Sequence, residues 1–134
     1  MADTFRTDIQ VRFNDTDAMG HVSNISIATY VEQARVDFFL ALGQPTKTLI
    51  LSHLTTDFRK QLHHTDEVVV TTQVTRLGNT SVGLAQNVSA NGDVAAETSS
   101  VGVIFDYGTQ RPMPIPDALR HALQPYLVAS EDDG

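Results

Sequence analysis

A single long segment with helical spacing, followed by a long region with strand-like spacing, limits what this chain can fold into. Between Ser23 and Leu42, apolar residues recur at intervals of three and four, the spacing of a helix that buries one stripe. Ser23 or Asn24 is a natural N-cap for this helix, and Gly43 followed by Pro45 is a natural end. The helix therefore needs other elements to cover its apolar surface.

Strands are expected on both sides of the helix. Before it, apolar and polar residues alternate from Thr7 to Phe13, as in a half-buried strand. After it, the region up to Phe105 contains apolar segments rich in Val and Thr, with turn signals at Gly78-Asn79 and Asn91-Gly92. Because tight turns join most of these segments, the sheet is expected to be largely antiparallel. The four strands expected there are 49–62, 66–77, 81–90 and 94–105.

One domain over residues 1–134 accounts for all these elements. We predict an α+β fold in which a curved, five-stranded sheet wraps around the long central helix, with small residues such as Ala34 and Gly102 allowing close approach. Another α+β sandwich, with the helix lying on one face, would use the same elements. Asp117 is expected to cap a last short helix over 118–124, and the acidic tail at 127–134 is expected to be disordered.

Composition excludes several classes of function. The formal net charge of −7 argues against nucleic acid as a partner, because binding nucleic acid relies on neutralising phosphates. The chain has no cysteine, which removes disulfides, thiolate metal sites and a cysteine nucleophile. The N-terminus lacks the pattern of a signal peptide, and no stretch is apolar enough to span a bilayer. We therefore expect a cytoplasmic protein with no membrane partner.

An acidic, glycine-containing loop between the first strand and the long helix carries the most chemistry. It places Asp15 and Asp17 just ahead of the helix N-terminus. That end of a helix presents unpaired backbone N–H groups and partial positive charge, so it can hold a developing oxyanion. A carboxylate beside such a helix end is a plausible hydrolytic site.

This loop resembles that of the hotdog-fold acyl-CoA thioesterases of the 4-hydroxybenzoyl-CoA thioesterase type. The motif is Val-Arg-Phe-Asn-Asp-Thr-Asp-Ala-Met-Gly-His-Val-Ser-Asn, residues 11–24. Weaker resemblances follow at 75–78 and 111–117, so the likeness extends over most of the chain. In the helix it continues through Tyr30, Glu32, Ala34, Arg35 and Phe38. The resemblance implies the hotdog fold, hydrolysis of an acyl-CoA to free acid and CoA, and a homo-oligomer, a dimer or tetramer, whose sheets pair edge to edge.

The resemblance also implies roles for individual residues. Asp17 corresponds to the catalytic carboxylate of the family, and the backbone N–H of Asn24 to the group that polarises the thioester carbonyl, with Ser23 a near alternative. Asp17 would either attack the carbonyl directly or deprotonate a water. His21 has three interpretations: a loop hydrogen-bonder, a residue that orients water or substrate, or a general base. Gly20 is expected to adopt a backbone angle closed to other residues, or to allow a ligand close approach.

Burial and bracing of the two loop carboxylates are further expectations. Asp17 is expected to be partly buried against apolar walls. Asp15 is expected to brace the loop, as aspartates in turns commonly do.

Other residues suggest ligand contacts less strongly. Arg59, Lys60 and Arg76 are candidates for the phosphates of coenzyme A, which would enter as part of the substrate and not as a cofactor. The cluster of His63, His64 and Asp66 lacks the spacing of a known zinc motif, so no metal is predicted. The serines at 81, 99 and 100 lack the sequence context of a serine nucleophile.

Two other functions fit a hotdog domain. A hotdog hydratase or dehydratase would use a His paired with an acidic residue, or an Asp followed by Asn-Pro and a His. Asp17 and His21 are only four residues apart with no Asn-Pro between them, which counts against this alternative. A non-catalytic acyl-thioester-binding protein would keep the apolar tunnel without needing Asp17.

Overall fold

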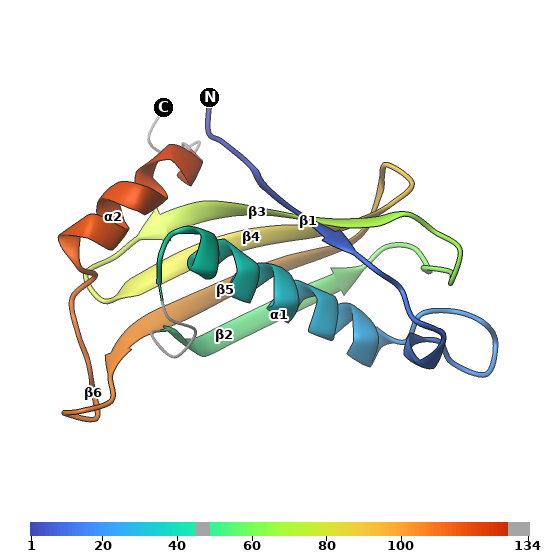
Figure 1. The fold of residues 1–134 in the computed structure, drawn as a ribbon, viewed down its shortest axis with the longest axis horizontal. Coiled ribbons are helices and arrows are strands. Elements are labelled where there is room, and N and C mark those ends of the chain that lie inside the picture. Colours follow the sequence, from blue (N-terminus) through green and yellow to red (C-terminus); the bar gives the residue numbers. More distant parts are fainter. Residues whose placement is uncertain (45–48, 129–134) are drawn as a thin grey trace.

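The computed structural model describes residues 1–44 and 49–128 and contains one long helix, one extended sheet and several short elements (Figure 1). The long helix is α1 (Asn24–Ala41), and a short helix α2 (Asp117–Leu123) lies near the C-terminus. The strands are β1 (Phe5–Ile9), β2 (Leu49–Phe58), β3 (Val68–Leu77), β4 (Ser81–Ala90), β5 (Asp93–Asp106) and β6 (Arg111–Pro112). Two 3₁₀ turns complete the set, η1 (Phe13–Asp15) and η2 (Gln124–Tyr126).

The sheet is antiparallel throughout and has the strand order β1-β3-β4-β5-β2. The prediction of five strands is close but incomplete, because the two-residue β6 pairs with β5 as a sixth. Tight turns join β3 to β4 and β4 to β5, as predicted. However, β2 pairs with β5 and not with its neighbour in sequence, β3. This places β1 and β2 at opposite edges of the sheet.

The sheet curves around α1 without closing, which confirms the predicted α+β hotdog arrangement (Figure 1). The helix packs mainly on β1, β3 and β4. The sequence pattern explains this packing: Val82, Leu84 and Val88 share one face of β4 and are fully buried, as are Ala34 and Phe38 on α1. Apolar burial of this kind is the main force that holds helix and sheet together.

The first strand differs from the prediction of 7–13. It runs from Phe5 to Ile9, and the chain then leaves the sheet, so that Phe13 is 79% exposed. The cause is local: Asp15 accepts a hydrogen bond from the Arg12 backbone N–H and closes the 3₁₀ turn η1. A side-chain-to-backbone bond of this kind competes with strand pairing. The alternation of apolar and polar residues therefore continues beyond Ile9 into residues 10–13, which are not part of β1.

The two ends of α1 follow capping rules, whereas the start of α2 differs from the prediction. Ser23 caps α1, with its hydroxyl oxygen accepting from the Ser26 N–H, and Gly43 follows the helix in a left-handed conformation. For α2 the cap is Pro116, and Asp117 is already helical. Pro45 lies outside the described residues, as does the predicted tail from 129 on. Val128, which the tail prediction includes, donates its N–H to the Val74 carbonyl on β3.

The edge strand β2 has an apolar face that α1 leaves open. Residues directly opposite each other in an antiparallel pair share a face, so Leu51, Leu54 and Phe58 lie on the same side as Gly102, Ser100 and Ala96 of β5. These three β2 side chains are 38%, 44% and 47% exposed. Gly102 also packs closely against β2. A Cβ at this position would lie 2.5 Å from side-chain atoms of Leu49. The sequence predicts that this glycine allows close approach of the helix, but the element that it contacts closely is the edge strand β2.

Candidate active site

The loop between η1 and α1 is a compact structure closed by its own backbone. Thr16 and Val22 form an isolated antiparallel bridge at its base. Inside it, the Asp17 N–H donates to the His21 carbonyl at 2.7 Å and the Gly20 N–H to the Asp17 carbonyl at 3.1 Å. Gly20 has φ of 81°, a backbone angle that other residues rarely adopt, as expected. The loop therefore holds Asp17 at a defined place ahead of the helix.

Only one oxygen of the Asp17 carboxylate accepts hydrogen bonds from the described residues. Its Oδ1 accepts from the Met19 N–H at 2.8 Å and from the His21 N–H at 3.1 Å. No donor to Oδ2 is found among residues 1–44 and 49–128, so this oxygen has its lone pairs free for chemistry. The expectation of partial burial is wrong for the single chain: Asp17 is exposed, because the loop projects beyond the helix and the sheet.

The start of α1 supplies the donors that an oxyanion needs. The Ser23 hydroxyl satisfies the Ser26 N–H, and the Ser23 carbonyl accepts from the Ile27 N–H. The N–H groups of Asn24 and Ile25 donate to no acceptor within the described parts of the chain. Unpaired N–H groups in a first helical turn attract negative charge, and the helix dipole adds to this attraction.

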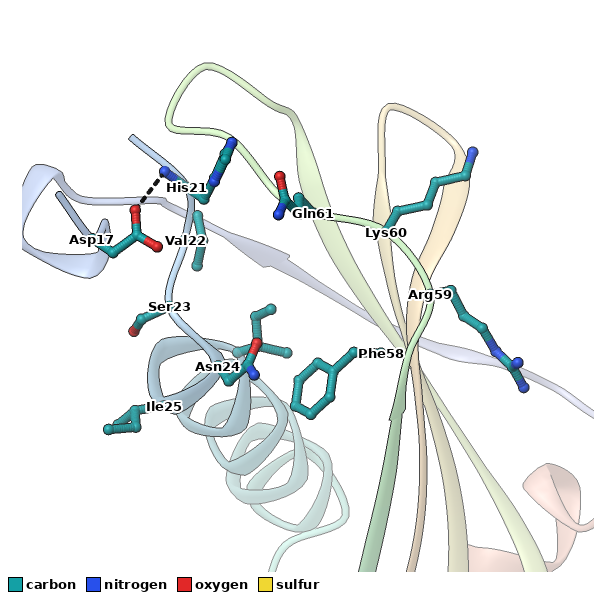
Figure 2. A pocket seen from close by; sticks show the side chains of 11 residues that line it. Asp17, His21, Val22, Ser23, Asn24, Ile25, Phe58, Arg59, Lys60 and Gln61 are labelled. Carbon is teal, nitrogen blue, oxygen red and sulfur yellow. Dashed lines mark hydrogen bonds between the residues drawn. The ribbon is translucent and has the colours of Figure 1, made fainter. Parts of the chain in front are cut away.

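Asp17 and the helix start line the same pocket, which has a volume of about 640 Å³ (Figure 2). The loop contributes Asp17 and His21, and the helix start contributes Ser23, Asn24 and Ile27. The opposite wall consists of residues 58–61. The pocket thus combines a carboxylate, free backbone donors and an apolar side that includes Ile27 and Phe58.

Two of the three predicted phosphate-binding cations lie at this pocket. Arg59 and Lys60 line it, but both are already paired: Arg59 bonds Glu97 at 3.1 Å and Lys60 bonds Asp93 at 3.4 Å. Their side chains point away from Asp17 and Asn24 (Figure 2). Arg76 is not brought to this pocket; it lies at the C-terminal end of β3 and lines a separate hollow with Arg120.

His21 contributes its backbone to the loop and its ring to a contact with a neighbouring segment. The His21 ring meets the His63 ring edge to face, with centroids 5.0 Å apart, and His63 Nδ1 lies 3.5 Å from Asp66. No group of three His, Cys, Asp or Glu side chains placed to hold a metal ion occurs in the part of the chain that the structure describes.

Asp15 braces the loop, as predicted. It is buried, and its Oδ2 accepts from the Tyr30 hydroxyl at 2.7 Å and from the Arg12 N–H at 3.0 Å. The Tyr30 hydrogen bond is the main reason that the pKa of Asp15 lies below its ordinary value. Burial, and then the same hydrogen bond, raises the pKa of Tyr30 well above its ordinary value. Tyr30 itself is a core residue.

Sequence reasoning named Arg59 and Lys60 in the second wall of the pocket but missed Phe58 and Gln61. Phe58 and Gln61 face the helix start only because the segment after β2 turns back to the loop: Val22 donates its N–H to the Leu62 carbonyl, and His21 pairs with His63. Such a pairing between distant segments leaves no local pattern. Phe58 is a large apolar residue inside the predicted strand 49–62, and this position gives no sign that it faces the helix start.

The chain is similar to known proteins in sequence and in fold. Residues 11–123 match the thioesterase-like superfamily. A predicted thioesterase from Bacillus stearothermophilus has a similar structure, with 31% identity, a TM-score of 0.88 and coverage of 96% of this chain and 99% of the other. A thioesterase from Thermus thermophilus, crystallised with coenzyme A and zinc, has 30% identity, a TM-score of 0.83 and coverage of 89% of this chain and 90% of the other.

A curated relative is more distant. The protein YsmA of Bacillus subtilis, described as uncharacterized, is 27% identical over 86 residues, and the match spans 60% of this chain and 58% of that protein.

The fold and the site define a hotdog-fold protein of the thioesterase type. The chain belongs to the thioesterase-like superfamily, which confirms the resemblance found in the loop motif. No helix among the described residues is both long enough and apolar enough to cross a membrane.

Proposed function

We propose that this protein hydrolyses the thioester bond of an acyl-CoA, giving a free acid and CoA. The observation that supports the proposal most strongly is that Asp17 lines one pocket together with Asn24 and Ile25, whose N–H groups donate to no acceptor among the described residues. A thioester carbonyl is electrophilic and a thiolate leaves readily, so one carboxylate and an oxyanion site suffice.

In the proposed reaction the carbonyl oxygen of the thioester lies against the helix start. The Asn24 N–H donates to this oxygen as it gains negative charge. Oδ2 of Asp17 either attacks the carbonyl carbon, forming a mixed anhydride that water then opens, or removes a proton from an attacking water. In both routes the C–S bond breaks, the electron pair leaves with sulfur as the CoA thiolate, and water supplies the new oxygen of the acid. His21 and Gly20 hold the loop that carries Asp17.

The acyl group and the CoA part have different proposed sites. The apolar face of β2, beginning at Phe58 beside the helix start, fits an acyl chain. Arg59 and Lys60 are the proposed partners of the CoA phosphates, and binding there requires them to exchange Glu97 and Asp93 for phosphate oxygens. Arg76 is not part of the proposed CoA site of its own chain, because it lines a separate hollow with Arg120.

A homodimer is part of the proposal. The exposed apolar face of β2 and its position at the sheet edge fit pairing with a second copy, as the family resemblance implies. A second sheet beside β2 would cover Leu51 and Leu54 and would enclose the acyl group.

We expect this protein in the cytoplasm, and that location stays a prediction.

The test of this function is free-thiol release from a panel of aromatic, short, branched and long acyl-CoAs. Asp17→Asn is expected to lower kcat by about a hundredfold or more, since a positioned general base contributes on that scale. Retained binding of the acyl-CoA by the Asp17→Asn protein would show that its pocket is intact. Ser99→Ala, which removes an exposed hydroxyl on β5, is the matched control and should leave turnover unchanged.

The competing functions give different results in the same assay. Binding of acyl-CoAs without turnover by the parent protein would support the non-catalytic alternative. Hydration of an enoyl-CoA without thiol release would support the hydratase. Turnover by Asp17→Asn equal to that of the parent would refute the catalytic role of Asp17.

A further inference from the structure

We propose that Tyr30 is a positioning residue, whose hydroxyl holds the catalytic loop in register with the start of α1. This inference rests on the proposed function, because it concerns the distance between Asp17 and the Asn24 N–H. Tyr30 lies in the second turn of α1, is 3% exposed and is not among the residues that line the pocket. Its hydroxyl instead reaches Asp15 at 2.7 Å.

Asp15 links three parts of the site. Its carboxylate accepts from Tyr30, which fixes the end of η1 to the second turn of the helix. Its backbone carbonyl accepts from the Ser23 N–H at 3.0 Å and from the Ser26 hydroxyl at 3.0 Å, which fixes the same point to the helix cap. The residue therefore joins the loop stem to α1 at two levels, one through its side chain and one through its backbone.

The loop that carries Asp17 begins one residue later. Thr16 pairs with Val22, and the hydrogen bonds that join Asp17 to Gly20 and His21 make the rest of the loop a closed unit. Because the unit is internally closed, its position relative to α1 depends on its stem and on the segment after β2, where the Leu62 carbonyl accepts from the Val22 N–H and His63 pairs with His21. The Tyr30–Asp15 bond is the contact that attaches this stem to the body of the helix beyond its first turn.

Charge makes this contact strong. The folded environment lowers the pKa of Asp15 and raises that of Tyr30, so at neutral pH an ionised carboxylate accepts from a protonated hydroxyl. Hydrogen bonds to a charged acceptor are shorter and stronger than those between neutral groups, which fits the 2.7 Å distance. A buried pair with this strength can maintain the position of the loop while substrates enter and leave.

Tyr30→Phe tests the proposal, since it removes the hydroxyl and keeps the buried ring. Catalysis is sensitive to displacements of about 1 Å, so we expect kcat to fall about tenfold or more while KM changes by no more than about twofold. The matched control is Tyr126→Phe, whose ring packs on Phe38 with centroids 5.0 Å apart, away from the loop. This control should leave kcat unchanged.

Substitutions of Asp15 separate its geometry from its charge. Asp15→Asn keeps an oxygen that can accept from Tyr30, whereas Asp15→Ala removes it. A positioning role predicts that Asp15→Asn retains much more activity than Asp15→Ala. Equal activities of Asp15→Asn and Asp15→Ala would overturn the inference.

Hydrogen exchange gives a readout that does not need turnover. In Tyr30→Phe the amides of residues 15–26 are expected to exchange faster than in the parent, while those of β3 and β4 keep their rates. An active parent with unchanged kcat and unchanged loop exchange in Tyr30→Phe refutes the positioning role alone. A parent inactive on the whole acyl-CoA panel refutes the proposed function instead, and the exchange data still decide whether Tyr30 holds the loop.

Discussion

Asp15 and Asp17 are two residues apart in sequence and occupy opposite environments. Asp15 is 7% exposed and its carboxylate is fully used by Tyr30 and Arg12. Asp17 is exposed, and its Oδ2 has no donor among the described residues. The difference arises because Asp15 faces back onto α1 at the end of a 3₁₀ turn, whereas Asp17 lies beyond the Thr16–Val22 bridge. The first residue is therefore suited to structure and the second to chemistry.

The lowered pKa of Asp15 predicts an acid-dependent part of the stability. A carboxyl group whose pKa is lower in the folded state stabilises that state above its ordinary pKa, here 3.8, and loses this contribution as the pH falls through the folded value. The Tm of the parent should therefore exceed that of Asp15→Asn by a constant difference near neutral pH. We expect the difference to shrink below pH 3.8. A difference that persists at lower pH would show that charge at Asp15 does not matter.

At the scale of elements, β2 and β5 approach each other closely at Gly102. Gly102 on β5 stands opposite Leu51, and an added Cβ would lie 2.5 Å from the Leu49 side chain. Gly102→Ala therefore forces Leu49 to move. Inserting a methyl group into a filled site typically costs about 1–3 kcal/mol, so the free energy of unfolding should fall by about that amount.

Denaturant unfolding of Gly102→Ala measures this cost, and Ser99→Ala on the exposed face of the same strand is the control. Since the strain falls on the edge strand, hydrogen exchange should accelerate mainly in β2. An unchanged free energy of unfolding would mean that Leu49 can turn away without loss of packing.

At the scale of the whole molecule, the uncovered face of β2 predicts self-association. Leu54→Lys places a charge in the proposed interface and is expected to shift the protein toward the monomer in light-scattering measurements of mass. Tyr107, which is 49% exposed on the turn after β5, offers the control Tyr107→Lys, which should not change the mass. A monomeric parent would refute the dimer, and a Leu54→Lys protein with the parent's mass would place the interface elsewhere.

The sequence predicts most of this architecture because its signals are local. Helical spacing gives α1, Gly and Asn residues give the β3–β4 and β4–β5 turns, and the loop motif gives Asp17 beside the helix start. Three features could not be predicted in this way. The pairing of β2 with β5, the wall at Phe58 and the separation of Arg76 from the pocket all depend on contacts between distant segments. The exposure of Asp17 depends on how far the loop projects.

The order of strands also sets an order of events during synthesis. The chain emerges from the ribosome with β2 ahead of β3, β4 and β5, yet β2 pairs with β5, which is made after the other two. Because Leu49 pairs with Ile104 and Phe58 pairs with Ala96, β2 can form its backbone hydrogen bonds only after β5 has been made. Closing so long a span costs entropy that is recovered only when the other strands are in place. The nascent chain therefore carries β2 unpaired until β5 has been made, and during this interval the apolar side chains of β2 lack the strand that pairs with them.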